Sequence, residues 1–225
     1  MSWYGLVREV LAVLDKDVRS EFRTRYAANS IALFAVTALA VVSFSVTPYS
    51  LDADVRAAFL WIVLFFSAMT GLSRSFVREE ESRTAMALRL ACLPNAVYLG
   101  KLLFNIGLLG AIETIVVPLF FVLMDTTPGH IGLFLAALVF GTIALAASTT
   151  IVAAIISRAN AKGALFAVLS FPLALPGLGA SIRATVVAFS GGGLPQAAGD
   201  IRLLIGHGVI MMALSLLLFE FVWND

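Results

Sequence analysis

The sequence predicts an all-α integral membrane protein with six transmembrane helices. Of its 225 residues, 60% are hydrophobic and only 13% are charged, and the apolar residues gather in six long runs. Soluble domains carry about 25% charged residues, and a bilayer core of ~30 Å requires about 20 apolar residues per helix. Because a small soluble domain leaves much of its surface in water, the bilayer is the expected solvent.

The six runs form one transmembrane domain over residues 1–225, with five or seven spans as the alternative counts. They cover residues 31–49, 57–73, 102–124, 131–156, 163–182 and 203–223. Glu113 is a charge inside the third run, and Pro172 and Pro176 must kink or break the fifth. The following segment, 183–200, combines an apolar stretch with three consecutive glycines. We expect it to form a short helix or re-entrant element at the outer surface.

Basic residues are distributed asymmetrically about these spans. If the N-terminus is inside, the outer segments contain only Arg56, Arg183 and Arg202 of the 15 Lys and Arg residues. The inner segments contain Arg8, Lys16, Arg19, Arg23, Arg25, Arg74, Arg78, Arg83, Arg89, Lys101, Arg158 and Lys162. Because cytoplasmic loops are enriched in Lys and Arg, we expect both termini to be cytoplasmic.

Residues 1–29 are predicted to form a helix at the cytoplasmic interface. Trp3, Leu6, Val10 and Val13 recur at helical spacing on one face, whereas the charged residues lie largely elsewhere. Such a helix lies with its apolar face in the lipid and its basic residues at the headgroups. A simple anchoring elbow is the favoured interpretation, and a partner-binding helix is the alternative.

The segment 74–100 is the one sizeable cytoplasmic loop that the topology predicts. Helix-forming residues dominate it, Glu79 and Arg83 have the favourable i,i+4 spacing, and Pro94 is a helix stop. We therefore predict a short charged helix beneath the membrane. From composition alone, a solvated surface helix without a partner would be the favoured interpretation.

The sequence lacks the motifs of several function classes. It has no phosphate-binding G-x-x-x-x-G-K-[ST] loop, no G-x-S-x-G elbow and no H-E-x-x-H helix. A single cysteine, Cys92, excludes an internal disulfide and a Cys-x-x-Cys-His haem attachment, and two histidines do not favour a metal centre. A net charge of +1 lacks the basic signature of a nucleic-acid-binding protein. We expect a membrane protein that is not itself an enzyme.

Glu113 is the sharpest candidate for an intramembrane function, because an ionisable side chain within a span usually faces a cavity or a partner. A protonatable gate or substrate pathway and a structural hydrogen bond to Ser or Thr of another helix have equal weight. Asn105 extends the same helix face. His130 and His207 lie toward the outer surface, where capping or hydrogen bonding is favoured over haem ligation.

The cytoplasmic loop resembles the coupling segment of ABC-2-type exporter permeases. In that segment an acidic residue, a Gly-Thr pair, a leucine, a proline and a lysine recur in this order. The matching residues are Glu81, Thr84, Leu88, Pro94 and Lys101, with Arg83 in place of the glycine. More specifically, residues 16–26, 71–81 and 96–105 resemble the CcmB family, the haem exporter protein B of cytochrome c maturation. The similarity extends through the whole chain.

This resemblance implies ABC-2-type (type V) exporter architecture in the bacterial inner membrane. It implies two copies of the permease, a CcmA-type ATPase that binds ATP, the subunits CcmC and CcmD, and indirectly the haem chaperone CcmE. An F-x-x-D sequence of the family, associated with ATPase contact, is matched by Phe76-Val-Arg-Glu79. The residues assigned to ATPase docking are Phe76, Arg78, Glu79, Glu80, Glu81 and Arg83.

Haem would then be a substrate and not a covalently bound cofactor. The candidates for contact with haem are His130, Arg183, Arg202 and His207. Because so few cationic groups are available for the propionates, we favour mechanical release of haem-loaded CcmE from CcmC over export of haem through this chain.

Three alternatives remain for the function. They are an ABC-2 permease for another lipid-like or drug substrate, a proton-coupled carrier built around Glu113, and a membrane scaffold without transport. Secondary carriers often show internal repeats, and the sequence contains none that we detect.

Overall fold

The computed structural model describes residues 3–45, 51–157 and 162–224, which form helices joined by turns and contain no strand. The helices are α1 (Trp3–Thr24), α2 (Tyr26–Ser45), α3 (Ala53–Leu72), α4 (Val77–Glu81), α5 (Ala85–Ala91), α6 (Pro94–Leu123), α7 (Ile131–Ile156), α8 (Lys162–Phe189) and α9 (Ala198–Asn224). Six of them are long and apolar enough to cross a membrane, so the predicted all-α membrane fold is confirmed. The end of the first predicted span, 46–49, and Arg158 lie outside the described residues.

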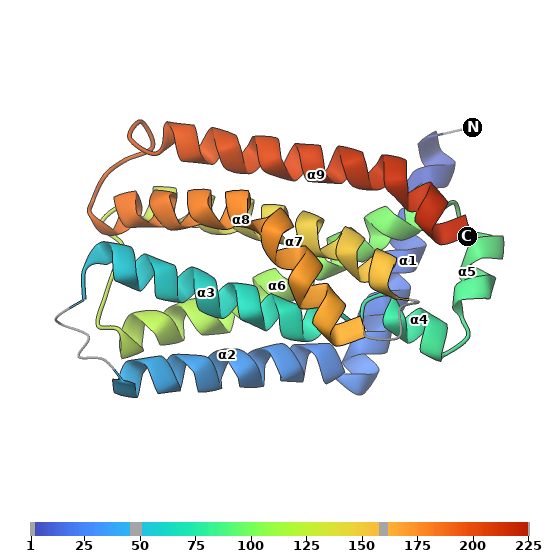
Figure 1. The fold of residues 1–225 in the computed structure, drawn as a ribbon, viewed down its shortest axis with the longest axis horizontal. Coiled ribbons are helices and arrows are strands. Elements are labelled where there is room, and N and C mark those ends of the chain that lie inside the picture. The colour runs from blue at the N-terminus through green and yellow to red at the C-terminus, as the bar shows by residue number, and fades with distance from the viewer. Residues whose placement is uncertain (1–2, 46–50, 158–161, 225) are drawn as a thin grey trace.

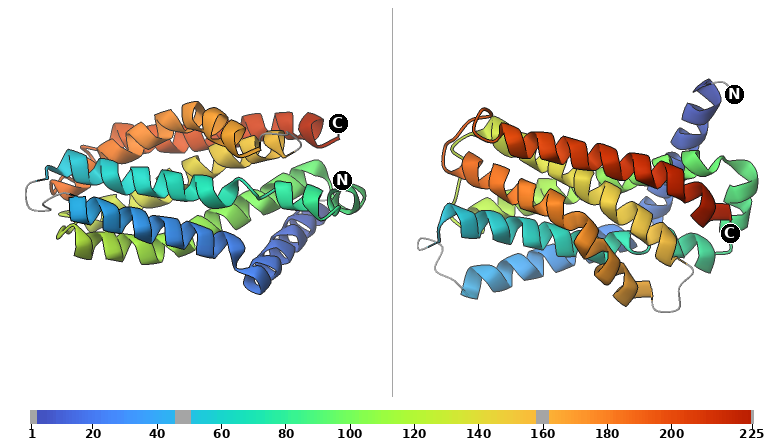
Figure 2. Two further views of the ribbon diagram at one scale, coloured as in Figure 1. Left: turned by 60° about the horizontal axis from the view of Figure 1, so that its bottom comes forward. Right: turned by 45° about the horizontal axis from the view of Figure 1, so that its top comes forward.

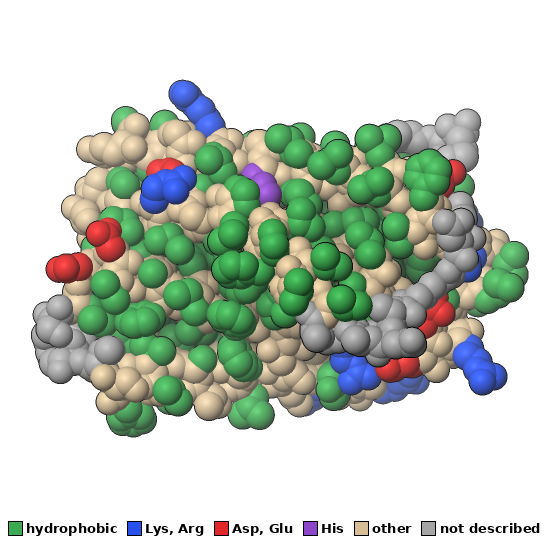
Figure 3. Space-filling view, viewed as in Figure 1, with side chains coloured by type: hydrophobic (Ala, Val, Ile, Leu, Met, Phe, Trp, Pro, Cys, Tyr) green, Lys and Arg blue, Asp and Glu red, His purple; other side chains and the backbone are tan. Residues whose placement is uncertain are grey.

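The six long helices run side by side in one bundle, and the start of α1 and the end of α9 lie at the same end of it (Figure 1). α7 is the central helix, since it packs against α6, α8 and α9. Hydrophobic side chains cover the middle of the face shown in Figure 3, and charged side chains lie toward its two ends. This distribution suits a bundle whose middle lies in hydrocarbon.

α8 remains one helix in spite of its two prolines. It contains Pro172 and Pro176 and continues to Phe189, and it changes direction near its middle (Figure 1). Proline bends a membrane helix without ending it when neighbouring helices satisfy the freed backbone groups. The prediction of a separate outer element for 183–200 is therefore wrong for residues 183–189, because these residues form the last turns of α8. The turn that follows contains Gly191 at a φ of +80°.

α1 lies obliquely across one end of the bundle and packs against the first half of α6 (Figure 2). Val10 and Val13, predicted to face lipid, are instead buried. A Cβ on Gly100 would lie 2.7 Å from the Val13 Cβ, so the glycine permits this close approach. The Glu9 carboxylate accepts a hydrogen bond from the Leu93 backbone N–H at 2.8 Å. It thereby caps the positive N-terminal end of α6.

Candidate functional site

The segment between the second and third spans folds into two short helices and not into the single helix that was predicted. α4 and α5 lie at the same end of the bundle as α1 (Figures 1 and 2). They are separated at Arg83, which has a φ of 55°. The left-handed region favours glycine, which explains why the resembling ABC-2 segments have glycine at this position. Pro94, predicted as a stop, occupies the first turn of α6.

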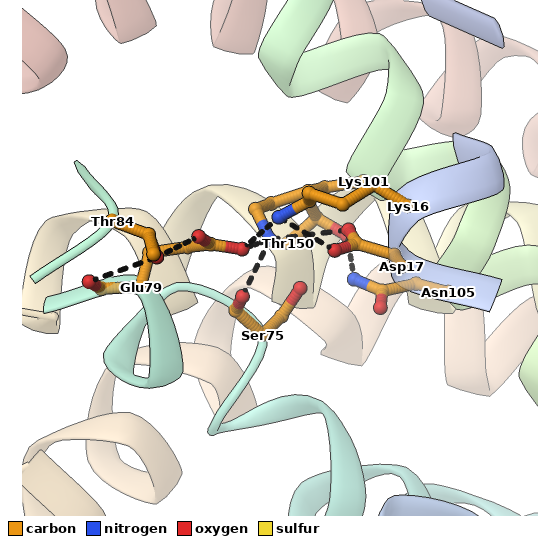
Figure 4. A network of polar contacts seen from close by, with 8 residues as sticks. All are labelled: Lys16, Asp17, Ser75, Glu79, Thr84, Lys101, Asn105 and Thr150. Atoms are coloured by element: carbon orange, nitrogen blue, oxygen red, sulfur yellow. Dashed lines mark hydrogen bonds and ion pairs between the residues drawn. The ribbon is translucent and has the colours of Figure 1, made fainter. Parts of the chain in front are cut away.

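A buried ionic network joins this segment to α1 and α6 (Figure 4). Lys101 of α6 is 1% exposed. Its Nζ donates to the Asp17 Oδ2 at 3.1 Å, the Glu79 Oε1 at 3.0 Å and the Ser75 carbonyl at 2.8 Å. Lys16 also contacts the Glu79 carboxylate and lies 3.0 Å from the Asp17 Oδ1. Two ammonium groups thus balance two carboxylates.

The network holds its charges because each is compensated by opposite charge and hydrogen bonds. Burial alone would lower the pKa of Lys16, but the carboxylates of Asp17 and Glu79 outweigh it, so the pKa is raised above its ordinary value. The Thr84 hydroxyl donates to the second Glu79 oxygen at 2.6 Å. Within the described residues Glu79 pairs with Lys16 and Lys101 and not with Arg83, its i,i+4 neighbour, and it thereby ties α4 to α1 and α6.

Phe76 is an internal residue of the bundle. Its side chain is 1% exposed, and its ring centroid lies 5.5 Å from that of Phe219 and 6.0 Å from that of Trp223. The Lys101 Nζ lies 5.2 Å from the same ring, within the range of a cation–π contact. The expectation that Phe76 inserts into an ATPase groove is not supported by this position. Glu79, 5% exposed, likewise faces inward.

The other predicted docking residues lie nearer the surface. Glu81 is exposed and pairs with Arg74 at 2.9 Å, and the Glu80 carboxylate lies 3.9 Å from the Arg89 guanidinium. Arg78 is half-buried, and Arg83 is exposed. Three of these four residues belong to α4, and Arg83 lies in the turn between α4 and α5.

Sequence reasoning missed the outward face of α5. Met86 is 67% exposed and Leu90 is 84% exposed, although both are large and apolar. They are four residues apart and therefore lie on one side of a helix. The i,i+4 spacing next to Arg83 and Arg89 was visible in the sequence, but only the burial of Ala85 shows which side faces out.

The polar residues of the third span face α7. The Asn105 side-chain amide donates to the Thr150 hydroxyl at 2.9 Å, and the Thr142 hydroxyl donates to the Glu113 carboxylate. Asn105 is fully buried and Glu113 is 8% exposed. The predicted common face is thus present, and Glu113 has the hydrogen bond to a threonine of another helix that was one of its two interpretations.

The four candidates for haem contact are placed separately. His130 caps α7 by accepting from the Leu133 N–H at 3.1 Å, whereas His207 lies 3.1 Å from the Ser148 hydroxyl within the bundle. Arg183 pairs with Asp200 at 2.7 Å, which joins the ends of α8 and α9. Arg202 is exposed. His130, His207 and Arg183 thus each contact a different residue of the bundle, and none of the four candidates contacts another in the hydrogen bonds and ion pairs of the described residues.

Six helices long and apolar enough to span a membrane, with a charged segment tied by buried ion pairs between the second and third, define a multi-pass α-helical membrane protein. A comparison with protein families matches residues 8–222 to the family described as CcmB protein. The chain therefore belongs to the CcmB family, the multi-pass inner-membrane permease components of cytochrome c maturation. A comparison with curated proteins gives no match.

Proposed function

We propose that this chain transmits the conformational work of a CcmA-type ATPase to a cytochrome c maturation complex. The observation that carries the proposal is that the two sides of the α4–α5 segment differ: one side contacts the helix bundle, and the other is exposed. Its inner side contacts α1, α6 and α9 through Glu79 and Phe76. Its outer side presents Met86 and Leu90.

The proposed orientation places this end of the bundle in the cytoplasm. Residues 3–25 and 74–101, which include α1, α4 and α5, contain ten of the twelve basic residues that were assigned to the inside, and positive residues favour the cytoplasmic side. Both termini are then cytoplasmic. This is also the side on which an ATPase has access to ATP.

The proposed docking surface consists of Met86 and Leu90 with Arg83, Arg78 and Glu81 around them. Apolar anchors surrounded by charged residues are typical of protein interfaces. ATP binding and hydrolysis switch the ATPase between states that contact α5 differently. This difference shifts the permease between conformations, because only differential binding moves a conformational equilibrium. Movement of α5 would reach α6 and α9 through α4. The proposal includes CcmC, CcmD and CcmE as further partners and two copies of the permease, as the resemblance to CcmB implies.

The docking surface predicts the phenotype of a double variant, Met86→Asp with Leu90→Asp. We expect loss of ATPase co-purification with unchanged protein yield and melting temperature, since both side chains are solvent-exposed. Tyr4→Asp is the matched control, because Tyr4 is 88% exposed on α1 and lies outside the surface. Co-purification of the double variant at the wild-type level would contradict the proposed docking site.

The transmitter role predicts that this permease and its ATPase alone do not move haem. Arg183, one of the two arginines that are candidates for haem contact, is already paired with Asp200, which leaves little to receive the propionates. Proteoliposomes containing only the two proteins should hydrolyse ATP without ATP-dependent transfer of haem. Transfer under these conditions would favour direct export. Sensitivity of the cellular phenotype to an uncoupler, with no dependence on the ATPase, would instead favour a carrier based on Glu113.

A further inference from the structure

Two adjoining cavities lie where α1 turns into α2. One, of about 450 Å³, is bordered by α1, α2, α3, α4 and α6, and the other, of about 460 Å³, by α1, α2 and α6. Glu21, Phe104 and Leu108 line both. Each volume lies in the usual range of small-molecule sites, about 300–1,000 Å³.

The first cavity is lined by buried acceptors that lack either a countercharge or a hydrogen-bond donor among the described residues. Glu21 is 9% exposed, and its carboxylate accepts from the Ala28 N–H at 2.9 Å, but no ion pair to it occurs within the described part of the chain. Asn105 is fully buried; its amide nitrogen is used, whereas its Oδ1 has no partner there. The Ser75 hydroxyl also lacks one. In Figure 4 these two side-chain oxygens carry no dashed contact.

The neighbouring acids differ from Glu21 because they are neutralised. Asp17 and Glu79 belong to the lysine network, and Glu81 pairs with Arg74. A buried carboxylate without countercharge and a buried oxygen without a donor both raise the free energy of the folded state. A positively charged group with several N–H donors would satisfy Glu21 and Asn105 together.

The same cavity also contains a cationic group for an anion. Arg78 lines it, and no ion pair to its guanidinium occurs within residues 3–45, 51–157 and 162–224. Guanidinium groups bind phosphate with two parallel hydrogen bonds. The cavity therefore suits a ligand that has an ammonium and a phosphate in one headgroup.

The second cavity is apolar over most of its wall. Its lining includes Leu14, Val18, Phe22, Leu103, Gly107 and Ala111. A Cβ on Gly107 would meet nothing within 4 Å, so the small residue leaves open space beside α6. The cavity lies between α1 and two spans, α2 and α6, and an amphipathic helix such as α1 lies at the boundary between lipid headgroups and acyl chains.

We propose that the two cavities together bind one phospholipid with a primary-amine headgroup, of the phosphatidylethanolamine class. Its ammonium lies at the Glu21 carboxylate and the Asn105 Oδ1, its phosphate lies at Arg78, and an acyl chain fills the second cavity. The lipid thereby fills the angle between α1 and the spans. This binding site shares Arg78 and Glu81 with the edge of the proposed ATPase surface, but neither Met86 nor Leu90 of α5 lines it.

Native mass spectrometry of the purified full chain tests this proposal. Samples are exchanged into detergent containing phosphatidylethanolamine, phosphatidylcholine or phosphatidylglycerol. We expect preferential retention of phosphatidylethanolamine by about tenfold, because a quaternary ammonium cannot donate hydrogen bonds and a glycerol headgroup lacks the positive charge. Equal retention of the three lipids would overturn the proposal.

Two variants separate the headgroup site from the acyl site. Glu21→Gln should abolish the preference among headgroups, and Gly107→Leu should reduce retention of all three lipids by filling the groove. Gly110→Leu is the control, since a Cβ there also meets nothing within 4 Å and Gly110 does not line either cavity. If Glu21→Gln fails to fold, Gly107→Leu and the wild-type preference still decide the question. Retention by Gly107→Leu equal to that of Gly110→Leu would contradict the acyl site.

Free phosphoethanolamine distinguishes a lipid from a soluble ligand with the same headgroup. We expect it to displace the bound lipid only at concentrations far above those at which the lipid itself competes, because it lacks the acyl chain. Displacement at equal concentrations would show that the apolar cavity contributes nothing and would overturn the lipid assignment.

Discussion

Replacing Lys101 with methionine is expected to destabilise the protein by about 3–5 kcal/mol, the usual effect of removing one partner from a buried ion pair. Lys101 is 1% exposed and contacts both Asp17 and Glu79. Without it, two buried carboxylates share the single ammonium of Lys16. Thermal unfolding of the purified protein in detergent, followed by the helical circular dichroism signal, measures the effect.

Two further variants test whether charge is the cause. Adding Glu79→Gln to Lys101→Met should restore part of the lost stability, because one uncompensated carboxylate disappears. Arg19→Ala is the surface control. It breaks the exposed pair of Arg19 with Asp15 and should leave the melting temperature unchanged, since such pairs contribute little. A Lys101→Met protein that melts like the wild type would show that the network does not stabilise the fold.

The second large effect is expected for Phe76→Ala, which should destabilise the protein by about 3–5 kcal/mol. The ring is buried against Phe219 and Trp223, so truncation leaves a cavity where α4 meets the end of α9. Phe44→Ala is the matched control, because Phe44 is 91% exposed on α2. The same unfolding experiment compares them.

The Phe76→Ala variant distinguishes two roles of Phe76 that the F-x-x-D resemblance does not separate, namely packing inside the bundle and direct contact with the ATPase. If Phe76 acts from inside, its loss lowers stability first and ATPase co-purification only as a consequence. The Met86→Asp, Leu90→Asp double variant should show the reverse, with ATPase binding lost and stability retained. A Phe76→Ala protein of wild-type stability that fails to bind the ATPase would instead restore Phe76 to the docking surface.

The sequence anticipated several local features of the candidate site. The capping position of His130 and the threonine partner of Glu113 were both among its interpretations, because capping needs only the adjacent turn and a buried carboxyl in a span needs some polar partner. It also placed the charged segment between the second and third spans. It did not anticipate Arg83 in a left-handed turn, although the glycine of resembling segments was the available signal.

By itself, the sequence determined the membrane class, the six spans and the asymmetry of basic residues. These properties are local, because in hydrocarbon each span must satisfy its own backbone hydrogen bonds within a continuous apolar run. Only the tertiary structure decided the roles of Phe76 and Glu79. Glu79 meets Lys16 across 63 positions and Lys101 across 22, and the burial of Phe76 depends on α9. Such contacts follow from how helices pack, which no local pattern of apolar and charged residues specifies.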